Sequence, residues 1–193
     1  MARDVEEGYE VWMAAFAGLV ESRNYFEISV SEIADAAGMS RVSFYNYFTD
    51  KEELLWKTYR HLFLDVENRV ASIDPVTLLS EGKPLTYYVF ENVKQHRRFY
   101  RSLFCTGMPP GFQQKMFDYV CQESHRTHAA LRARYKRTDF PYLLINEYLT
   151  GALFAVIRSM LHQEADWDSA SLAEFFTALA GPGLIRMLDQ ESN

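Results

Sequence analysis

One short segment of the chain combines an apolar face with polar side chains that are free to reach a partner. Phe44 and Phe48 are four residues apart and share one face of a helix, whereas Arg41, Ser43 and Asn46 remain available elsewhere. A helix with this division packs on one side and probes a groove with the other. The elements around it must therefore hold it at the surface.

The preceding residues predict a first helix that begins at Ser29. Ser29 followed by Glu32 is a capping box, in which the serine side chain accepts from the Glu32 amide and the glutamate reaches back to the Ser29 amide. Ile28 and Ile33 flank this box as a hydrophobic staple. The segment therefore predicts a well-defined helix start.

A glycine separates the two helices. Gly38 adopts a left-handed backbone conformation without steric cost, so the chain turns there. Ser40 is then placed to cap the second helix. Helix, glycine turn and helix is the general helix-turn-helix pattern, whose second helix lies in the major groove of DNA.

The string ISVSEIADAAGMSRVSFYNYFTDKEELL, residues 28–55, strongly resembles the N-terminal DNA-binding domain of TetR/AcrR-type transcriptional regulators. The resemblance covers about the first 60 residues. The version with Arg41 and a Phe44-Tyr45 pair is similar to the subgroup that includes regulators of dihydroxyacetone kinase operons. The matched residues are Ile28, Ser29, Val30, Ile33, Ala34, Ala37, Gly38, Met39, Ser40, Phe44, Tyr45, Tyr47, Phe48 and Lys51.

The resemblance implies which residues contact DNA. Arg41 is able to donate two bonds to guanine, Val42 to touch a thymine methyl, and Asn46 to read adenine or hold a phosphate. Many family members have glycine or serine where this chain has Val42. This difference bears on which operator sequence is recognised and not on how the helix binds DNA. Phosphate contacts are expected from Ser29, Tyr45, Tyr47 and Lys51, with packing around the turn as the alternative for the two tyrosines. The full expected set is Ser29, Ser40, Arg41, Val42, Ser43, Tyr45, Asn46, Tyr47 and Lys51.

The charge balance opposes a generic nucleic-acid binder. The chain has a net charge of −6, and residues 1–60 hold six basic and eleven acidic side chains, a net charge of −5. DNA affinity depends largely on lysine and arginine replacing counterions. Hydroxyls, backbone amides and helix N-termini also bind phosphate without changing the formal charge. We therefore expect tight binding only to a specific operator.

The periodicity predicts an all-α protein with an N-terminal three-helix DNA-binding domain, 1–50, and a helical effector-binding and dimerisation domain, 51–193. The first helix is expected over 5–22, with Val11, Ala14, Ala15, Gly18 and Leu19 as its buried stripe. A fourth helix, capped by Asp50, connects the two domains over 51–71. Later helices are expected at about 85–95, 97–106, 111–135, 139–163 and 169–180, the last ended by Gly181-Pro182-Gly183.

Two late helices predict a dimer interface. The segment 139–163 is apolar nearly all the way round, which favours burial against a second chain as well as against its own domain. A four-helix interface between two subunits would set two recognition helices about 34 Å apart on a palindromic operator. The alternative is that both helices belong to a monomer core. The expected interface residues are Leu153, Val156, Ile157, Leu172, Phe175, Phe176 and Leu179.

The C-terminal part is rich in aromatic side chains that can line a small-molecule pocket. Such a stripe is also typical of an ordinary core. A ligand would act by favouring one of two dimer shapes, with the fourth helix as the connection. The expected ligand-binding residues are Tyr88, Asn92, Phe99, Phe104, Phe117, Asn146, Glu147 and Tyr148.

Other chemistry finds little support. Cys121, His125 and His128 share a helix face, but three ligands need a fourth, so no metal and no cofactor are expected. The basic run 132–137 is interpreted as a solvated helix end. The chain has no recognisable catalytic motif, and it is not expected to be an enzyme. The acidic N-terminal residues and the absence of a long apolar run predict a cytoplasmic protein without membrane contact.

Three functions remain open. The first is a dimeric, ligand-responsive transcription factor, most often a repressor in this family. The second is a regulator that responds to a partner protein, for which the dihydroxyacetone-kinase subgroup offers a precedent. The third is a helical interaction protein that has lost operator affinity, which the acidic N-terminal domain leaves possible.

Overall fold

The computed structural model describes residues 2–71, 73, 85–127, 141–163 and 167–189, and every regular element in these ranges is helical. The chain divides into two compact units. The first unit comprises Met1–Leu64 and His96–Pro110, and the second comprises Asp65–Gln95 and Gly111–Asn193. The predicted all-α class is confirmed.

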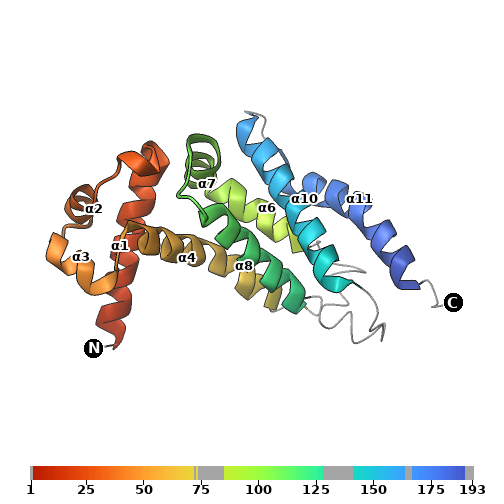
Figure 1. Ribbon diagram of the computed structural model, residues 1–193, viewed down its shortest axis with the longest axis horizontal. Helices are drawn as coiled ribbons and strands as arrows, with labels where there is room; N and C mark the ends of the chain where they lie inside the picture. Colours follow the sequence, from red (N-terminus) through yellow and green to blue (C-terminus); the bar gives the residue numbers. More distant parts are fainter. Residues whose placement is uncertain (1, 72, 74–84, 128–140, 164–166, 190–193) are drawn as a thin grey trace. The chain divides into compact units, whose positions relative to one another are not determined.

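The first unit holds the predicted helix-turn-helix (Figure 1). α2 packs against both α1 and α3, and α7 and η2 also pack against α1. The elements of this unit are α1 (Ala2–Ser22), the 3₁₀ turn η1 (Tyr25–Glu27), α2 (Val30–Ala37), α3 (Arg41–Tyr47), the start of α4 (Lys51–Ala71), α7 (Arg97–Arg101) and the π-helical turn η2 (Ser102–Thr106).

Local signals place α2 and α3 as expected. Both halves of the Ser29–Glu32 capping box are formed, and Gly38 has a φ of 67° at the end of α2. The Ser40 side chain accepts from the Ser43 amide at 3.0 Å and so caps α3. These three signals are confirmed.

The buried face of α1 differs from the prediction. Val11 is 43% exposed, and the side chains that enter the core are Trp12, Met13, Phe16 and Val20. The predicted stripe is wrong because it followed the spacing of small apolar residues. Large aromatic rings remove more area from water, so Trp12 and Phe16 determine which face is buried.

The second unit is built from pairs of packed helices. α8 (Phe112–Thr127) packs against α10 (Tyr142–His162), and α6 (Leu85–Gln95) packs against both α10 and α11 (Ser169–Asp189). α8 and α10 lie side by side in Figure 1. The buried apolar side chains of this unit include Val89, Phe90, Val93, Phe112, Met116, Leu153, Phe154, Ile157, Met160, Leu161, Leu172 and Ala173.

Helix α11 is longer than predicted. It continues to Asp189 with Pro182 inside it, whereas the sequence predicted an end at about residue 180. A proline removes one backbone hydrogen bond and a glycine costs about 1 kcal/mol relative to alanine. The residues on both sides of Pro182 keep helical geometry despite this cost, so the Gly-Pro-Gly signal did not end the helix.

Helix α10 is long and apolar enough to cross a membrane, judged by length and composition alone. Its most apolar window has a mean hydropathy of 1.2, and 28% of that window is buried. The expectation that no segment would reach this threshold is wrong. A helix that packs in a core or against a second chain meets the same criterion, because both environments reward apolar surface.

Candidate nucleic-acid interface

Helix α3 presents one face to solvent. Val42 is 75% exposed and Tyr45 is 53% exposed, and Arg41 and Asn46 are also exposed. Among the described residues, none makes a hydrogen bond or an ion pair with the Arg41 guanidinium. This arginine is therefore available to an external partner.

The opposite face of α3 is fixed by aromatic packing. Phe44 is fully buried and Phe48 is 2% exposed. The Trp12 ring lies edge-on to Phe44, with ring centroids 5.5 Å apart and an interplanar angle of 85°. Edge-to-face pairs of this kind contribute about 0.5–1.5 kcal/mol beyond their buried area. The division expected between packing and exposed residues on this helix is confirmed.

Tyr47 lies against α1 as well as near the interface. Its ring centroid is 5.1 Å from that of Tyr9 with the planes at 89°, and the Tyr9 hydroxyl donates to the Tyr47 carbonyl at 3.4 Å. A Cβ atom built on Gly8 would lie 2.3 Å from the Tyr47 hydroxyl oxygen. Tyr47 therefore packs on α1 at a position that only glycine leaves open.

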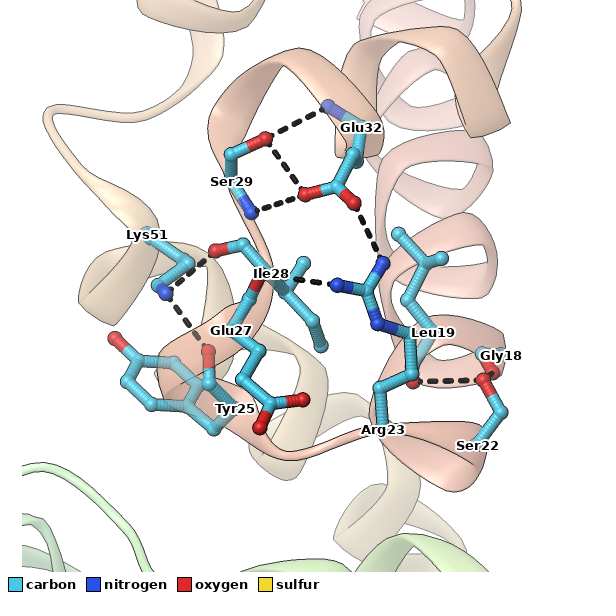
Figure 2. Close-up of polar contacts among 10 residues, drawn as sticks. All are labelled: Gly18, Leu19, Ser22, Arg23, Tyr25, Glu27, Ile28, Ser29, Glu32 and Lys51. Atoms are coloured by element: carbon cyan, nitrogen blue, oxygen red, sulfur yellow. Dashed lines mark hydrogen bonds and ion pairs between the residues drawn. The ribbon is translucent and has the colours of Figure 1, made fainter.

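Ser29 is already engaged in the capping box (Figure 2). Its hydroxyl accepts from the Glu32 amide at 3.2 Å and donates to Glu32 Oε2 at 2.7 Å. The side chain is exposed but both of its hydrogen-bonding roles are in use. A phosphate contact at Ser29 would compete with the cap.

Lys51 binds inside the unit. Its ammonium group donates to the carbonyl oxygens of Tyr25 at 2.8 Å and Ile28 at 2.6 Å, and it lies 4.1 Å from the centroid of the Tyr25 ring (Figure 2). An ammonium group has three N–H donors, so one remains for an external phosphate. Partial burial lowers the pKa of Lys51 and raises that of the Tyr25 hydroxyl to about 12.

Sequence reasoning missed an ion pair next to the capping box. Arg23 Nη1 lies 2.5 Å from Glu32 Oε1, and Arg23 Nη2 donates to the Glu27 carbonyl at 3.1 Å (Figure 2). The Arg23 bond and the two Ser29 donors lower the pKa of the Glu32 carboxyl to about 2. Nine positions separate the two residues, so no local spacing pattern indicates that they pair.

The basic side chains near the interface are mostly paired internally. Arg23 binds Glu32, Lys51 binds two carbonyls, and Lys57 lies 3.9 Å from Glu53. Among the described side chains of residues 7–60, no cluster of free basic groups therefore offsets the acidic excess. Arg41 is exposed at the start of α3, where base edges are read in this class of fold.

The predicted ligand residues are dispersed. Phe99 and Phe104 belong to the first unit, whereas Glu147 and Tyr148 lie on α10 and are exposed, Tyr148 by 70%. Tyr88 is half-buried on α6.

Two of the predicted ligand residues lie at the contact of α8 with α10. Asn146 is 2% exposed, its Oδ1 accepts from Ser124 Oγ at 3.2 Å, and its Nδ2 lies 3.1 Å from His125 Nδ1. Phe117 packs on Phe154 with ring centroids 5.7 Å apart. Asn92 is equally buried on α6.

The predicted interface residues fall into two groups. Leu153, Ile157 and Leu172 are buried within the second unit, whereas Phe175 is 56% exposed and Leu179 70% exposed. Val156 and Phe176 are intermediate. Leu143 and Leu144 on α10 are exposed by 68% and 63%, so α10 and α11 both present apolar side chains to solvent.

The possible metal site is partly outside the described residues, because His128 lies there, as does the basic run 132–137. Within the described part of the chain, no cluster of three potential metal ligands is found. Burial raises the pKa of the Cys121 thiol, which disfavours the thiolate that a metal requires.

Residues 14–56 match the family model of the tetR family of bacterial regulatory proteins. The transcriptional activator DhaS of the dhaKLM operon from Lactococcus lactis subsp. lactis (strain IL1403) is 43% identical over 54 residues. This match spans 28% of the present chain and 29% of that protein. It therefore covers less than a third of either protein.

Solved structures share the fold over most of the chain. A structure of the dihydroxyacetone kinase operon activator DhaS aligns over 92% of this chain and 96% of its own, with a TM-score of 0.58 and 19% identity. The Thermus thermophilus FadR repressor, solved in complex with lauroyl-CoA, aligns over 95% and 97%, with a TM-score of 0.68 and 22% identity. A TetR-family regulator from Streptomyces coelicolor aligns over 95% and 88%, with a TM-score of 0.64 and 19% identity.

The family match coincides with the residues that form α2, the Gly38 turn and α3, and the helical second unit has the fold of solved regulators. Residues 14–56 therefore match the helix-turn-helix region of the tetR family of bacterial regulatory proteins, and the chain shares its helical fold with solved regulators of that family.

Proposed function

We propose that this regulator binds a palindromic operator as a homodimer, represses transcription there, and is released by a small-molecule effector. One observation carries the DNA-binding part of the proposal. Helix α3 buries Phe44 and Phe48 while it exposes Arg41, Val42, Tyr45 and Asn46, and no described residue pairs with the Arg41 side chain.

Base recognition is assigned to the first turn and the outer face of α3. Arg41 donates to the O6 and N7 atoms of a guanine, and Val42 contacts a thymine methyl group. Asn46, one turn later, contacts adenine or a phosphate. Ser43 is half-buried, and its short side chain is assigned a polar contact with the DNA. A bidentate arginine contact of this type discriminates between bases by about 1–3 kcal/mol.

Phosphate binding is assigned to Tyr45, Tyr47 and the third N–H of Lys51. Tyr45 is the most accessible of the three side chains, at 53%. Ser29 and Ser40 hold the starts of α2 and α3 and act on DNA mainly by positioning these helices. The helix N-termini add outward-pointing backbone amides.

The acidic surroundings predict high selectivity. Because few free cations are available near α3, we expect weak and strongly salt-dependent binding to random DNA. Binding of random duplexes as tightly as the best operator at about 150 mM salt would contradict this expectation.

Dimerisation is assigned to the exposed apolar side chains of α10 and α11. Phe175 and Leu179 are more than half exposed, and an apolar surface of this kind favours a protein contact. A two-fold dimer places its two α3 helices about one DNA turn apart, roughly 34 Å. The operator is then a palindrome.

Effector binding is assigned to the helical region 51–193, with 1–50 as the DNA-binding domain and α4 as the helix that links the two. The acyl-CoA complex of the FadR repressor supports this division, because that relative shares the fold and carries a small molecule. Tyr88, Asn92, Phe117 and Asn146 are the retained candidates, and the protein acts in the cytoplasm.

A second candidate is an activator controlled by a partner protein. The similarity to an activator of a dihydroxyacetone kinase operon favours it, because 54 residues of this chain are 43% identical to that activator. Small molecules added without any partner would separate the two candidates. Release of DNA by a small molecule alone supports the first.

The test is selection of bound duplexes from a random pool by the purified chain. We expect one palindromic sequence to be enriched. Arg41→Ala should relax the preference at one position of each half-site, and Tyr45→Phe should weaken all sequences alike. Arg126→Ala, which removes an exposed arginine from α8, is the matched control and should leave the selection unchanged. Unchanged selection by both α3 variants would overturn the assignment, and no enrichment at all would favour an interaction protein that lost operator binding.

A further inference from the structure

The π-helical turn η2 packs against the part of the first unit that leads into the helix-turn-helix. Although η2 (Ser102–Thr106) follows α6 and α7 in sequence, it contacts α1 and η1. π-helical turns are rare, and they occur frequently at functional sites. The chain enters this segment from the second unit after Gln95 and returns to that unit at Gly111.

Two hydrogen bonds join η2 to the residues that follow α1. Ser102, which is 8% exposed, donates from Oγ to the Arg23 carbonyl at 3.1 Å. The last carbonyls of a helix lack partners within the helix, and the Ser102 hydroxyl supplies one just beyond the end of α1. The Asn24 side chain donates from Nδ2 to the Thr106 carbonyl at 3.4 Å.

The glycine that follows η2 also lies beside η1. Gly107 directly follows η2 and has a φ of 120°, a conformation that favours glycine. A Cβ atom at this position would lie 3.4 Å from the Phe26 ring. Gly107 therefore lies beside Phe26, and η1 and η2 pack against each other.

The residues that η2 contacts lead directly to α2. Residues 23–29 link α1 to α2, and we call them the connector. The Arg23 side chain binds Glu32 at 2.5 Å, and Glu32 closes the capping box with Ser29 (Figure 2). Lys51 holds the same connector through the carbonyls of Tyr25 and Ile28.

We propose that Ser102 is a positioning residue for DNA binding, which acts on α2 and α3 through the connector and the Arg23–Glu32 pair. This inference rests on the proposed use of α3 for DNA recognition. Ser102 fixes the Arg23 backbone, Arg23 fixes Glu32, and Glu32 fixes the start of α2. α3 then follows α2 after the Gly38 turn.

A small displacement at the connector is enough to affect binding. Recognition contacts lose strength when the side chains deviate from productive geometry by more than about 0.5 Å. The segment that holds Ser102 is continuous with α6 on one side and α8 on the other. The second unit is therefore linked through the chain to η2, and η2 reaches the connector through the hydrogen bonds of Ser102 and Asn24.

The test measures the affinity of the full-length chain for the duplex that the wild-type chain selects from a random pool. Ser102→Ala removes the bond to Arg23 and should weaken binding by about two- to tenfold, the range expected for one hydrogen bond. Ser102→Thr retains the hydroxyl and should restore most of the affinity. Ser22→Ala is the matched control, because the Ser22 hydroxyl bonds only carbonyls of its own helix, with Leu19 at 3.0 Å and Gly18 at 3.3 Å (Figure 2).

A double-mutant cycle separates positioning from stability. Arg23→Gln breaks the link to Glu32, so Ser102→Ala should weaken DNA binding much less in that background, while its effect on the thermal midpoint persists. If Ser102→Ala proves poorly folded, Asn24→Asp replaces it. That variant keeps the oxygen that accepts from the Phe26 amide at 3.0 Å and loses the donor to Thr106.

Two results would overturn the inference. One is a folded Ser102→Ala or Asn24→Asp chain that binds the selected duplex as tightly as wild type. The other is a double variant whose loss of affinity equals the product of the losses in Ser102→Ala and Arg23→Gln, because the two residues would then act independently. A wild-type chain that selects no duplex would instead contradict the proposed function.

Discussion

Substitution of two glycines on α1 should have opposite effects on stability. Gly8 is buried and Gly18 is exposed, and both lie inside the same helix. Alanine is favoured over glycine in a helix interior by about 0.5–1 kcal/mol. A Cβ atom on Gly18 would meet nothing within 4 Å, so Gly18→Ala should raise the free energy of unfolding by that amount.

Gly8→Ala should lower the free energy of unfolding. The new methyl group would lie 2.3, 2.7 and 2.9 Å from the hydroxyl oxygen, Cζ and Cε1 of Tyr47, whereas carbon atoms prefer about 3.5–4.0 Å. The ring must move by about 1 Å, and overpacking of this kind costs about 1–3 kcal/mol. After the helix gain, we expect a net loss of about 1–2 kcal/mol.

Urea unfolding of both variants measures the difference. Tyr47→Phe removes the closest of the three contacts, so Gly8→Ala should cost less in that background. Gly8→Ala should also weaken operator binding, because Tyr47 moves, whereas Gly18→Ala should not. Equal stabilisation by the two alanines would refute the packing of Tyr47 on α1.

Three further predictions concern charge and assembly. The pKa of Glu32, lowered to about 2, means that its carboxylate stabilises the fold above about pH 4.5 and that this contribution is lost as the pH falls toward 2. Unfolding free energies measured from pH 7 to 3 should therefore decline less steeply in Glu32→Gln than in wild type, and parallel curves would contradict this. Lys51→Met should lower the free energy of unfolding by about 2 kcal/mol, because two hydrogen bonds from a charged donor are removed. Lys57→Met, which removes an exposed ion pair, should lower it by about 0–1 kcal/mol in the same denaturant assay. Leu179→Glu on α11 should shift the chain from dimer to monomer in sedimentation, and Val11→Glu on α1 should not; an unchanged dimer in Leu179→Glu would exclude this face.

The helix-turn-helix was predictable because its signals are local. The Ser29–Glu32 box, the Gly38 turn and the Ser40 cap each involve residues within four positions of one another, so sequence spacing determines them. The exposed and buried faces of α3 followed from Phe44 and Phe48 for the same reason.

The remaining errors have a common physical origin in tertiary contacts. Lys51 meets Tyr25 and Ile28 across 26 and 23 positions, and no local pattern encodes such a pair. On α1, the size of Trp12 outweighed the spacing of smaller residues. Phe99 joins the first unit because the chain returns to it, which the aromatic pattern does not show.

The most direct test of base reading by α3 combines a protein variant with a base analogue. The selected duplex is prepared with 7-deazaguanine, which lacks the N7 acceptor, at the guanine assigned to Arg41. Wild type should lose about fivefold or more in affinity on this duplex, within the range for a bidentate arginine contact. Arg41→Ala should bind both duplexes equally. Equal losses in the wild-type and Arg41→Ala proteins would contradict the recognition of that base by Arg41.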